Sequence, residues 1–198
     1  MSSRDTILKA LREAAPGGVE APAMYTPDAP AADLLESFEF RLKACGGELA
    51  VLRSVEELAP LLSARWPDLA ERSVYSTNPA AVPTSLPEAA FTDTAALQHL
   101  DLAIVDGCEC VAENAAVWVP AGAVPHRSLL YLAEHLVLIV RRDALLPTMH
   151  EAYARLAQRG DTSGYFIAGP SKTSDIAQCL VIGAQGPRSC LVCMVGDA

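Results

Sequence analysis

The sequence predicts an α/β fold: one domain with a mostly parallel sheet and helices on both faces. Three observations predict it. With 198 residues, 51% of them hydrophobic, the chain can bury a sizeable core without disulfides or metal. Its expected strands are short, continuously apolar runs, which are typical of strands covered on both faces. Helical patterns alternate with these runs, as expected for a parallel sheet.

The first 30 residues are expected to form a helix and a loop ahead of the main domain. Thr6–Arg12 has the spacing of a short amphipathic helix, and Pro16-Gly17-Gly18 ends that pattern. An Ala- and Pro-rich stretch then runs to about Pro30 and is the one plausible flexible linker. The main domain is therefore expected to span residues 31–198.

Two helices are predicted early in this domain. Residues 31–45 have apolar side chains at helical spacing, and Gly46-Gly47 ends the pattern. The second helix is expected to start at Ser54, whose hydroxyl would cap it while Glu57 reaches back in a capping box.

The remaining elements follow in chain order. Strands are expected at 48–52, 73–76, 101–106, 110–112, 115–119, 136–140, 165–168 and 189–195. Helices or helical turns are expected at 94–99, 127–133, 143–159 and, after a turn at Gly169–Asp175, through about Ile182.

Charge and hydropathy argue against two classes of partner. Fifteen basic residues against 24 acidic ones give a net charge of -9, which disfavours nucleic acid and anionic membranes. Apolar stretches such as Leu136–Val140 are far shorter than the roughly 20 residues needed to span a bilayer. The N-terminus lacks an apolar signal core, so a cytoplasmic location is expected. A locally positive pocket could still bind an anion.

The six cysteines are expected to be free thiols, and no metal site is predicted. Cys190 and Cys193 form a C-x-x-C within an expected strand, where residues three apart point to opposite faces. Cys108 and Cys110 could share a face, which leaves redox chemistry there as a weaker alternative. The four histidines have no ligand spacing: His99, His126, His135 and His150.

The turn after the strand at 165–168 is the best candidate for a ligand site. At a strand-to-helix turn, free backbone N–H groups and the helix dipole favour a phosphate or carboxylate. The turn offers a glycine, two hydroxyl groups, one cation and one carboxylate: Gly169, Ser171, Thr173, Lys172 and Asp175. The alternative is that Ser171 or Thr173 simply caps the helix.

Three other features have both a structural and a functional interpretation. Gly183 and Gly186 bracket a second turn, which is either a helix stop or part of the ligand site. Glu113-Asn114, between two apolar runs, is either an ordinary turn or contains a catalytic acid or base. His135 precedes an apolar strand and is either a semi-buried structural histidine or a ligand-binding one.

The run Gly169–Ile176, continued by Gly183–Arg188 and a closing apolar strand, resembles the C-terminal signature of a known family. This is the lactate-utilisation protein C family (LutC/YkgG, LUD domain, DUF162). Glu113, the segment Arg127–Leu130 and His135 fall where that family has its other motifs. The similarity covers most of the chain after residue 30 and is most specific in the last third.

The resemblance implies a NagB/RpiA/CoA-transferase-like fold and a role in oxidising L-lactate to pyruvate alongside two iron–sulfur partner proteins. It implies that this chain itself holds no cofactor, the clusters residing in the partners, and it leaves a homo-oligomer open. Together, the motifs and the resemblance predict that a small organic anion is bound by Gly169, Ser171, Lys172, Thr173, Asp175, Gly183, Gly186, Asn114 and His135.

The chain departs from the family pattern at three places. Asn114-Ala115-Ala116 replaces the usual Thr-Gly-Thr, Gln185 replaces a histidine, and Tyr131 stands where proline is common. These departures indicate a divergent subgroup. Two functions stay open: an accessory subunit of lactate utilisation, or a stand-alone enzyme of the sugar-phosphate, CoA or folate kind with Glu113 as acid/base or nucleophile. A scaffold without a ligand is the third alternative.

Overall fold

The computed structural model describes residues 2–15, 18, 20, 33–92, 94–160 and 163–196. At its centre lies a five-stranded sheet in the order β1-β11-β6-β3-β2, and every neighbouring pair in it is parallel. Its strands are β1 (Glu48–Leu52), β2 (Val74–Ser76), β3 (Leu102–Asp106), β6 (His135–Arg141) and β11 (Ser189–Val195). The predicted mostly parallel sheet is confirmed.

A second, four-stranded sheet has the order β7-β4-β5-β8. It is antiparallel at β4-β5 and β5-β8 and parallel at β4-β7. Its strands are β4 (Glu109–Val111), β5 (Ala116–Pro120), β7 (Leu145–Leu146) and β8 (Gly164–Ile167). Two short strands, β9 (Lys172–Thr173) and β10 (Val181–Ile182), form a separate antiparallel pair.

The helices begin and end at residues that suit their positions. They are α1 (Ser3–Ala14), α2 (Leu34–Ala44), α3 (Leu58–Arg65), α4 (Leu129–Leu132) and α5 (Met149–Arg159). Short 3-10 turns are η1 (Val55–Glu57), η2 (Leu69–Glu71), η3 (Glu88–Thr92), η4 (Thr94–Leu97), η5 (Ala121–Ala123) and η6 (Arg142–Ala144). The Asp33 and Thr148 side chains cap the free N–H groups of α2 and α5. No helix in the described part of the chain is long and apolar enough to cross a membrane.

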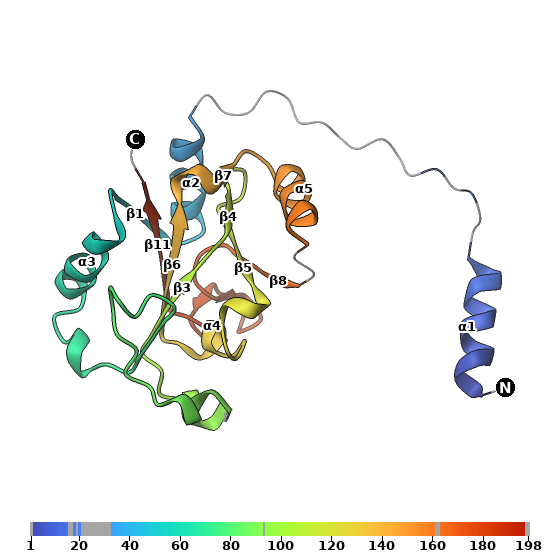
Figure 1. Ribbon diagram of the computed structural model, residues 1–198, viewed down its shortest axis with the longest axis horizontal. Coiled ribbons are helices and arrows are strands. Elements are labelled where there is room, and N and C mark those ends of the chain that lie inside the picture. The colour runs from blue at the N-terminus through green and yellow to red at the C-terminus, as the bar shows by residue number, and fades with distance from the viewer. Residues whose placement is uncertain are drawn as a thin grey trace.

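The main sheet is covered on both faces, as predicted (Figure 1). One face packs against α3 in a cluster that contains Leu58, Leu62 and Trp66. The other face packs against α2, α4 and the second sheet. Side chains of β6 alternate between the two clusters, which is the consequence of the two-residue period of a strand. Helix α5 packs on the outer face of the second sheet through Ala152.

The two cysteines of the C-x-x-C point to opposite faces, as predicted. Cys190 belongs to the cluster that includes α2 and the second sheet, and Cys193 to the cluster that includes α3. Burial raises the pKa of each thiol to about 12, so both are protonated at neutral pH. They pack as small apolar side chains.

The predicted helix from the Gly169–Asp175 turn through Ile182 is wrong. The chain forms the β9–β10 hairpin there, with its turn at Ala177 and Gln178, whose φ angles are 54° and 56°. β-branched residues at the two strands favour pairing over a helix.

The helix predicted over residues 143–159 begins only at Met149. Pro147 has no N–H to donate and biases the residue before it toward an extended conformation. Leu145–Leu146 therefore pairs with β4 as β7, and Thr148 starts the helix as its N-cap.

The predicted capping box at Ser54 is also wrong, because the Ser54 side chain caps nothing. Instead, the Glu57 carboxylate accepts a hydrogen bond from the Arg53 backbone N–H at 3.0 Å. A 3-10 turn precedes α3, so the regular helix begins at Leu58. The predicted Ala- and Pro-rich loop lies largely outside the described residues.

Candidate functional site

The loops that follow β8 and β10 meet at a cavity of about 330 Å³. The cavity lies at the edge where the strands of the main sheet begin, because Gly46 packs on Pro170 just before β1, and Pro187 just precedes β11. Its lining consists of Leu130, Tyr131, Leu136, residues 166–172 and residues 185–187. Four predicted ligand-binding residues are thereby brought together: Gly169, Ser171, Lys172 and Gly186.

Backbone hydrogen bonds fix the two loops against each other. The Ser171 N–H donates to the Pro187 carbonyl, and the Gly183 N–H donates to the Ser171 carbonyl, each at 2.9 Å. A Cβ at Gly186 would lie only 3.0 Å from the Ser171 Cβ, so the second loop passes directly over Ser171. Ser171 is therefore held at the meeting point of both glycine-containing turns.

Gly169 and Lys172 connect this loop to the carboxyl end of α2. Gly169 has a φ of 77°, and a Cβ there would lie 2.9 Å from the Cys45 carbonyl oxygen. The Lys172 ammonium donates a hydrogen bond to the same oxygen, at a helix end that carries partial negative charge. An ammonium has three N–H donors, so two remain for a ligand in the cavity.

The other predicted residues of this loop do not line the cavity. Thr173 and Asp175 belong to the β9–β10 hairpin, where the Asp175 N–H donates to the Thr173 hydroxyl at 3.2 Å. A Cβ at Gly183 would meet Arg188 at 2.3 Å, so this glycine serves close packing. Because no helix begins here, the helix-dipole argument for anion binding no longer applies, and side chains must supply the binding.

The structure places Glu113 and Asn114 at the β4–β5 turn, and neither lines the cavity. The Glu113 carboxylate accepts a hydrogen bond from the Met149 backbone N–H at 2.8 Å, at the first turn of α5. The Asn114 side chain accepts one from Ala116 N–H at 3.0 Å and supports Ala115 at a φ of 56°. This geometry favours the ordinary-turn interpretation and separates Glu113 from the Gly169 loop.

His135 lies on the opposite face of the main sheet from the cavity. Its neighbour Leu136 lines the cavity, whereas the His135 ring lies 5.2 Å from Trp66, between centroids, on the α3 side. Nδ1 lies 2.8 Å from the Ser189 hydroxyl, across the register pair of β6 and β11. Burial lowers the pKa of His135, with nearby arginines adding to the effect and Glu134 opposing it. The geometry supports the structural interpretation.

Sequence reasoning missed two side chains with polar groups in the cavity lining, Tyr131 and Gln185. Tyr131 packs edge-to-face on Tyr165 at 6.0 Å, and burial raises its pKa, with Tyr165 adding to the shift. Both are positions at which the chain departs from the family pattern. The departures were therefore the available signal, and they lie together on the wall of one cavity.

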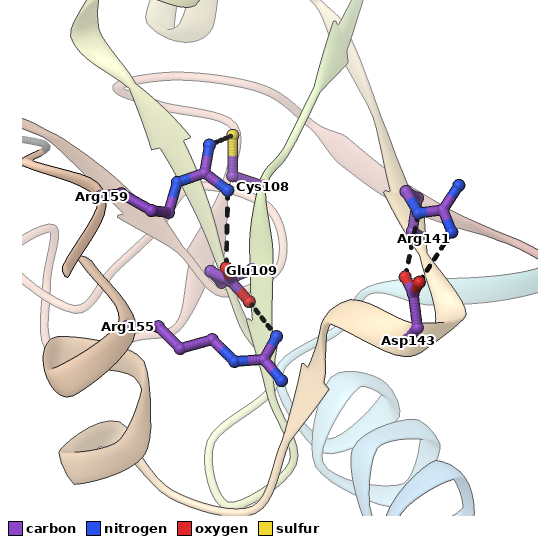
Figure 2. A network of polar contacts seen from close by, with 6 residues as sticks. All are labelled: Cys108, Glu109, Arg141, Asp143, Arg155 and Arg159. Atoms are coloured by element: carbon purple, nitrogen blue, oxygen red, sulfur yellow. Dashed lines mark hydrogen bonds and ion pairs between the residues drawn. The ribbon is translucent and has the colours of Figure 1, made fainter.

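A buried ion-pair network also escaped notice (Figure 2). Glu109, 3% exposed, lies on β4 between two arginines of α5. Its carboxylate oxygens are 3.1 Å from Arg155 Nη1 and 3.6 Å from Arg159 Nη1. Arg159 also donates to the Cys108 sulfur at 3.3 Å. The network joins α5 to the second sheet. Across the described residues, no group of three or more His, Cys, Asp or Glu side chains could hold a metal ion.

A parallel sheet covered on both faces, a mixed second sheet and a small polar cavity define an α/β domain with a candidate small-ligand site. The family model for the LUD domain matches residues 67–195. The chain therefore belongs to the LUD domain family, which confirms the resemblance found in the sequence.

Two curated relatives are both lactate utilization protein C. The protein from Halalkalibacterium halodurans is 28% identical over 102 residues, which cover 48% of this chain and 44% of the relative. The protein from Geobacillus kaustophilus is 27% identical over 146 residues, covering 71% and 57%. The chain thus spans about half the length of the curated relatives it matches.

A solved structure supports the fold. The crystal structure of a DUF162 family protein from Deinococcus radiodurans superposes with a TM-score of 0.58 at 18% identity. The match covers 82% of this chain and 96% of that one.

Proposed function

We propose that this LUD protein acts in L-lactate utilisation and binds a small organic carboxylate, of the lactate or pyruvate kind, in the cavity beside Ser171. The observation that supports the ligand proposal is the convergence of Ser171, Lys172 and Gln185 on one cavity of about 330 Å³. That size is at the lower end of the roughly 300–1,000 Å³ of typical ligand pockets, as suits a small ligand.

Each part of such a ligand has a chemical counterpart in the lining. Lys172 can pair with the carboxylate through a charge-assisted hydrogen bond. The Ser171 hydroxyl and the Gln185 amide can each donate to or accept from the hydroxyl or keto oxygen. Leu130 and Leu136 supply an apolar wall for the methyl group. In this arrangement Gln185 and Tyr131, the two departures from the family pattern that line the cavity, set its selectivity.

The names of the curated relatives support the biological role, and the family resemblance supports the partners. We propose an accessory subunit that acts with iron–sulfur proteins in oxidising lactate to pyruvate, the clusters residing in those partners. Co-expression with the iron–sulfur proteins of such a system, followed by affinity purification of this chain, tests the association. A stable complex supports the subunit proposal, and separate elution at every salt concentration contradicts it.

Isothermal titration calorimetry of the purified chain with L-lactate and pyruvate tests the ligand proposal. Lys172→Gln removes the positive charge and retains a donor for the Cys45 carbonyl, so it separates ligand binding from loop structure. We expect a loss of affinity of about tenfold or more, since charge-assisted hydrogen bonds contribute roughly 1.5–3 kcal/mol. Lys43→Gln is the matched control, because the exposed Lys43 side chain pairs with Glu39 on α2. Equal affinities of wild type and Lys172→Gln would refute the site.

A further inference from the structure

A cavity of about 800 Å³ lies at the opposite edge of the main sheet from the cavity beside Ser171 that is proposed to bind lactate. It is lined by the residues at which four parallel strands end. Arg53 follows β1, Asp106 ends β3, Arg141 ends β6, and Gly196 follows β11. Ligands of open parallel sheets bind at this carboxyl edge.

The topology also makes this point of the sheet a switch point. The connection after β1 passes through α3 on one face, whereas the connection after β6 leads to β7 and the second sheet on the other face. Strand β11 lies between them. The connections that follow β1 and β6, the strands on either side of β11, thus leave toward opposite faces and open a crevice at the carboxyl ends of these strands. The rule for α/β sheets places the ligand in such a crevice.

The charges in the crevice favour an anion. Arg141 is engaged by Asp143 through hydrogen bonds of 2.9 and 2.6 Å (Figure 2). Arg53 and Arg142 also line the crevice, and within the described ranges neither guanidinium donates a hydrogen bond or forms an ion pair. Two uncommitted arginines in one cavity stand out in a chain of net charge -9.

The same crevice contains an acceptor for hydroxyl groups. Asp106 receives a hydrogen bond from the Thr77 hydroxyl at 2.6 Å on one carboxylate oxygen. Its second oxygen accepts no hydrogen bond from the residues that the structure describes. A carboxylate at a strand end of such a sheet commonly binds the hydroxyls of a ribose.

Glycine backbone allows close packing around the crevice. Gly107 follows Asp106, and a Cβ there would lie 2.4 Å from the Val117 side chain, so only glycine fits. Gly196 has a φ of 132°, and a Cβ there would lie 3.5 Å from the Arg142 Cβ. The backbone after β11 and the arginine after β6 are thus adjacent walls.

We propose that this crevice binds a phosphorylated, hydroxyl-bearing small molecule, with Arg53 and Arg142 on the phosphate and Asp106 on a hydroxyl of the sugar. Guanidinium groups match phosphate geometry and bind it through paired hydrogen bonds. The cavity is near the upper end of the size range of small-molecule pockets, about 300–1,000 Å³, and far exceeds the needs of lactate. The proposal is independent of the lactate site.

Calorimetry of the full chain tests the proposal with ADP, ribose 5-phosphate, coenzyme A and inorganic phosphate, each probed separately, and with adenosine and ribose as unphosphorylated controls. We expect at least one sugar-linked phosphate to bind and its unphosphorylated counterpart to be silent. The probe with the highest affinity identifies the source of the phosphate. Binding of inorganic phosphate alone, equal binding of the unphosphorylated controls, or silence of all probes up to millimolar concentration overturns the proposal.

Variants assign the binding to the crevice. Arg53→Gln and Arg142→Gln should each weaken the phosphorylated probe by about tenfold or more, and the double variant further. Both side chains are uncommitted, so circular dichroism should show an unchanged fold. Arg12→Gln on α1 controls for the loss of one charge. Lys172→Gln should leave this binding unchanged, just as the arginine variants should leave lactate binding unchanged. Full affinity in the double arginine variant overturns the assignment.

Discussion

The two edges of the central sheet differ in how their polar groups are used. At the edge where the strands begin, Lys172 is bonded to the Cys45 carbonyl and Gly169 packs against the same residue. At the edge where the strands end, Arg53 and Arg142 line a cavity more than twice as large, and their guanidinium groups have no partner within the described residues. Lys172 at the first edge thus holds its loop against the end of α2, whereas the Arg53 and Arg142 guanidinium groups at the second edge are free for a ligand.

The contrast between the two edges shows that a ligand site need not be formed by a contiguous sequence motif. The Gly169–Asp175 run can be recognised in the sequence because its residues are consecutive. In the structure, however, Gly169 allows close packing of its loop against Cys45. The crevice at the other edge is assembled from the last residues of β3, β6 and β11 and from the residues that follow these strands and β1. Such a site is visible only when the topology brings the strand ends together.

The largest expected effect comes from separating α5 from the second sheet. Replacing Arg155 and Arg159 together by alanine leaves the buried Glu109 carboxylate without a partner, and such a loss costs about 3–5 kcal/mol. Urea denaturation should show this loss of stability. The chain between β6 and α5 contains Arg142, so phosphate binding at the crevice should weaken more than lactate binding at the opposite edge.

The matched control for the urea denaturation is Arg141→Ala. Its ion pair with Asp143 is exposed, with 79% and 67% of the two side chains accessible, and exposed pairs contribute only about 0–1 kcal/mol. If the double variant at Arg155 and Arg159 unfolds at the same urea concentration as wild type, the network does not hold the two parts together.

The next largest effect is expected at the edge where the strands begin. Gly169→Ala places a Cβ at a φ of 77° and within 2.9 Å of the Cys45 oxygen, which should cost roughly 1–3 kcal/mol. Gly160→Ala has a similar φ of 74° but no neighbour within 4 Å, so it measures the conformational cost alone. Thermal unfolding should show a clearly larger shift for Gly169. Equal shifts would mean that the close approach to α2 does not matter.

Much of the fold follows from local patterns in the sequence. Strands β1 and β11 match their expected ranges because each is a continuous apolar run between turn residues. In the hairpin at 172–182, for which a helix was expected, Ile176 and Leu180 are four residues apart, a spacing that would also fit one face of a helix. In the structure both are exposed on that hairpin, with 53% and 70% of their surface accessible. Spacing alone does not reveal whether an apolar pair is buried.

The site was predicted in part for a similar reason. Ser171 and Gly186 come together because they flank the β9–β10 hairpin on either side and are therefore close along the chain. Glu113, in contrast, was grouped with them by the resemblance, and the structure places it beside Met149. Its partner lies 36 residues away on a helix whose start depends on Pro147. Such a nonlocal cap has no signal in a single sequence.

A smaller effect is expected for Glu113 itself. Glu113→Ala removes the acceptor for the Met149 N–H and should cost about 0.5–1.5 kcal/mol, the usual contribution of one hydrogen bond. Glu113→Gln retains the acceptor oxygen and should recover most of this stability. Both variants should keep wild-type affinity for lactate and for phosphorylated probes. A loss of any detectable turnover in Glu113→Gln, with stability unchanged, would instead support the stand-alone enzyme.

The smallest effect is a pH dependence that belongs to one edge only. Burial lowers the pKa of His135 below its ordinary 6.5, so between the folded pKa and about 6.5 the unfolded chain binds more protons than the folded protein. The contribution of His135 to stability is therefore complete above pH 6.5 and is lost as the pH falls through that window. Carboxylates with lowered pKa values, such as Glu48 beside Arg65, respond below their ordinary 4.5.

Urea denaturation at several pH values between 7 and 5 measures this slope. His135→Gln can keep a hydrogen bond to Ser189 and removes the titrating group, so its stability should vary less over that range. His150→Gln, at an exposed position on α5, is the matched histidine control. No histidine is among the residues that line the crevice at the edge where the strands end. Acidification should therefore destabilise the edge where the strands begin and leave phosphate binding at the other edge largely intact. If stability and phosphate binding were lost in parallel as the pH falls, the two edges would be coupled through the sheet.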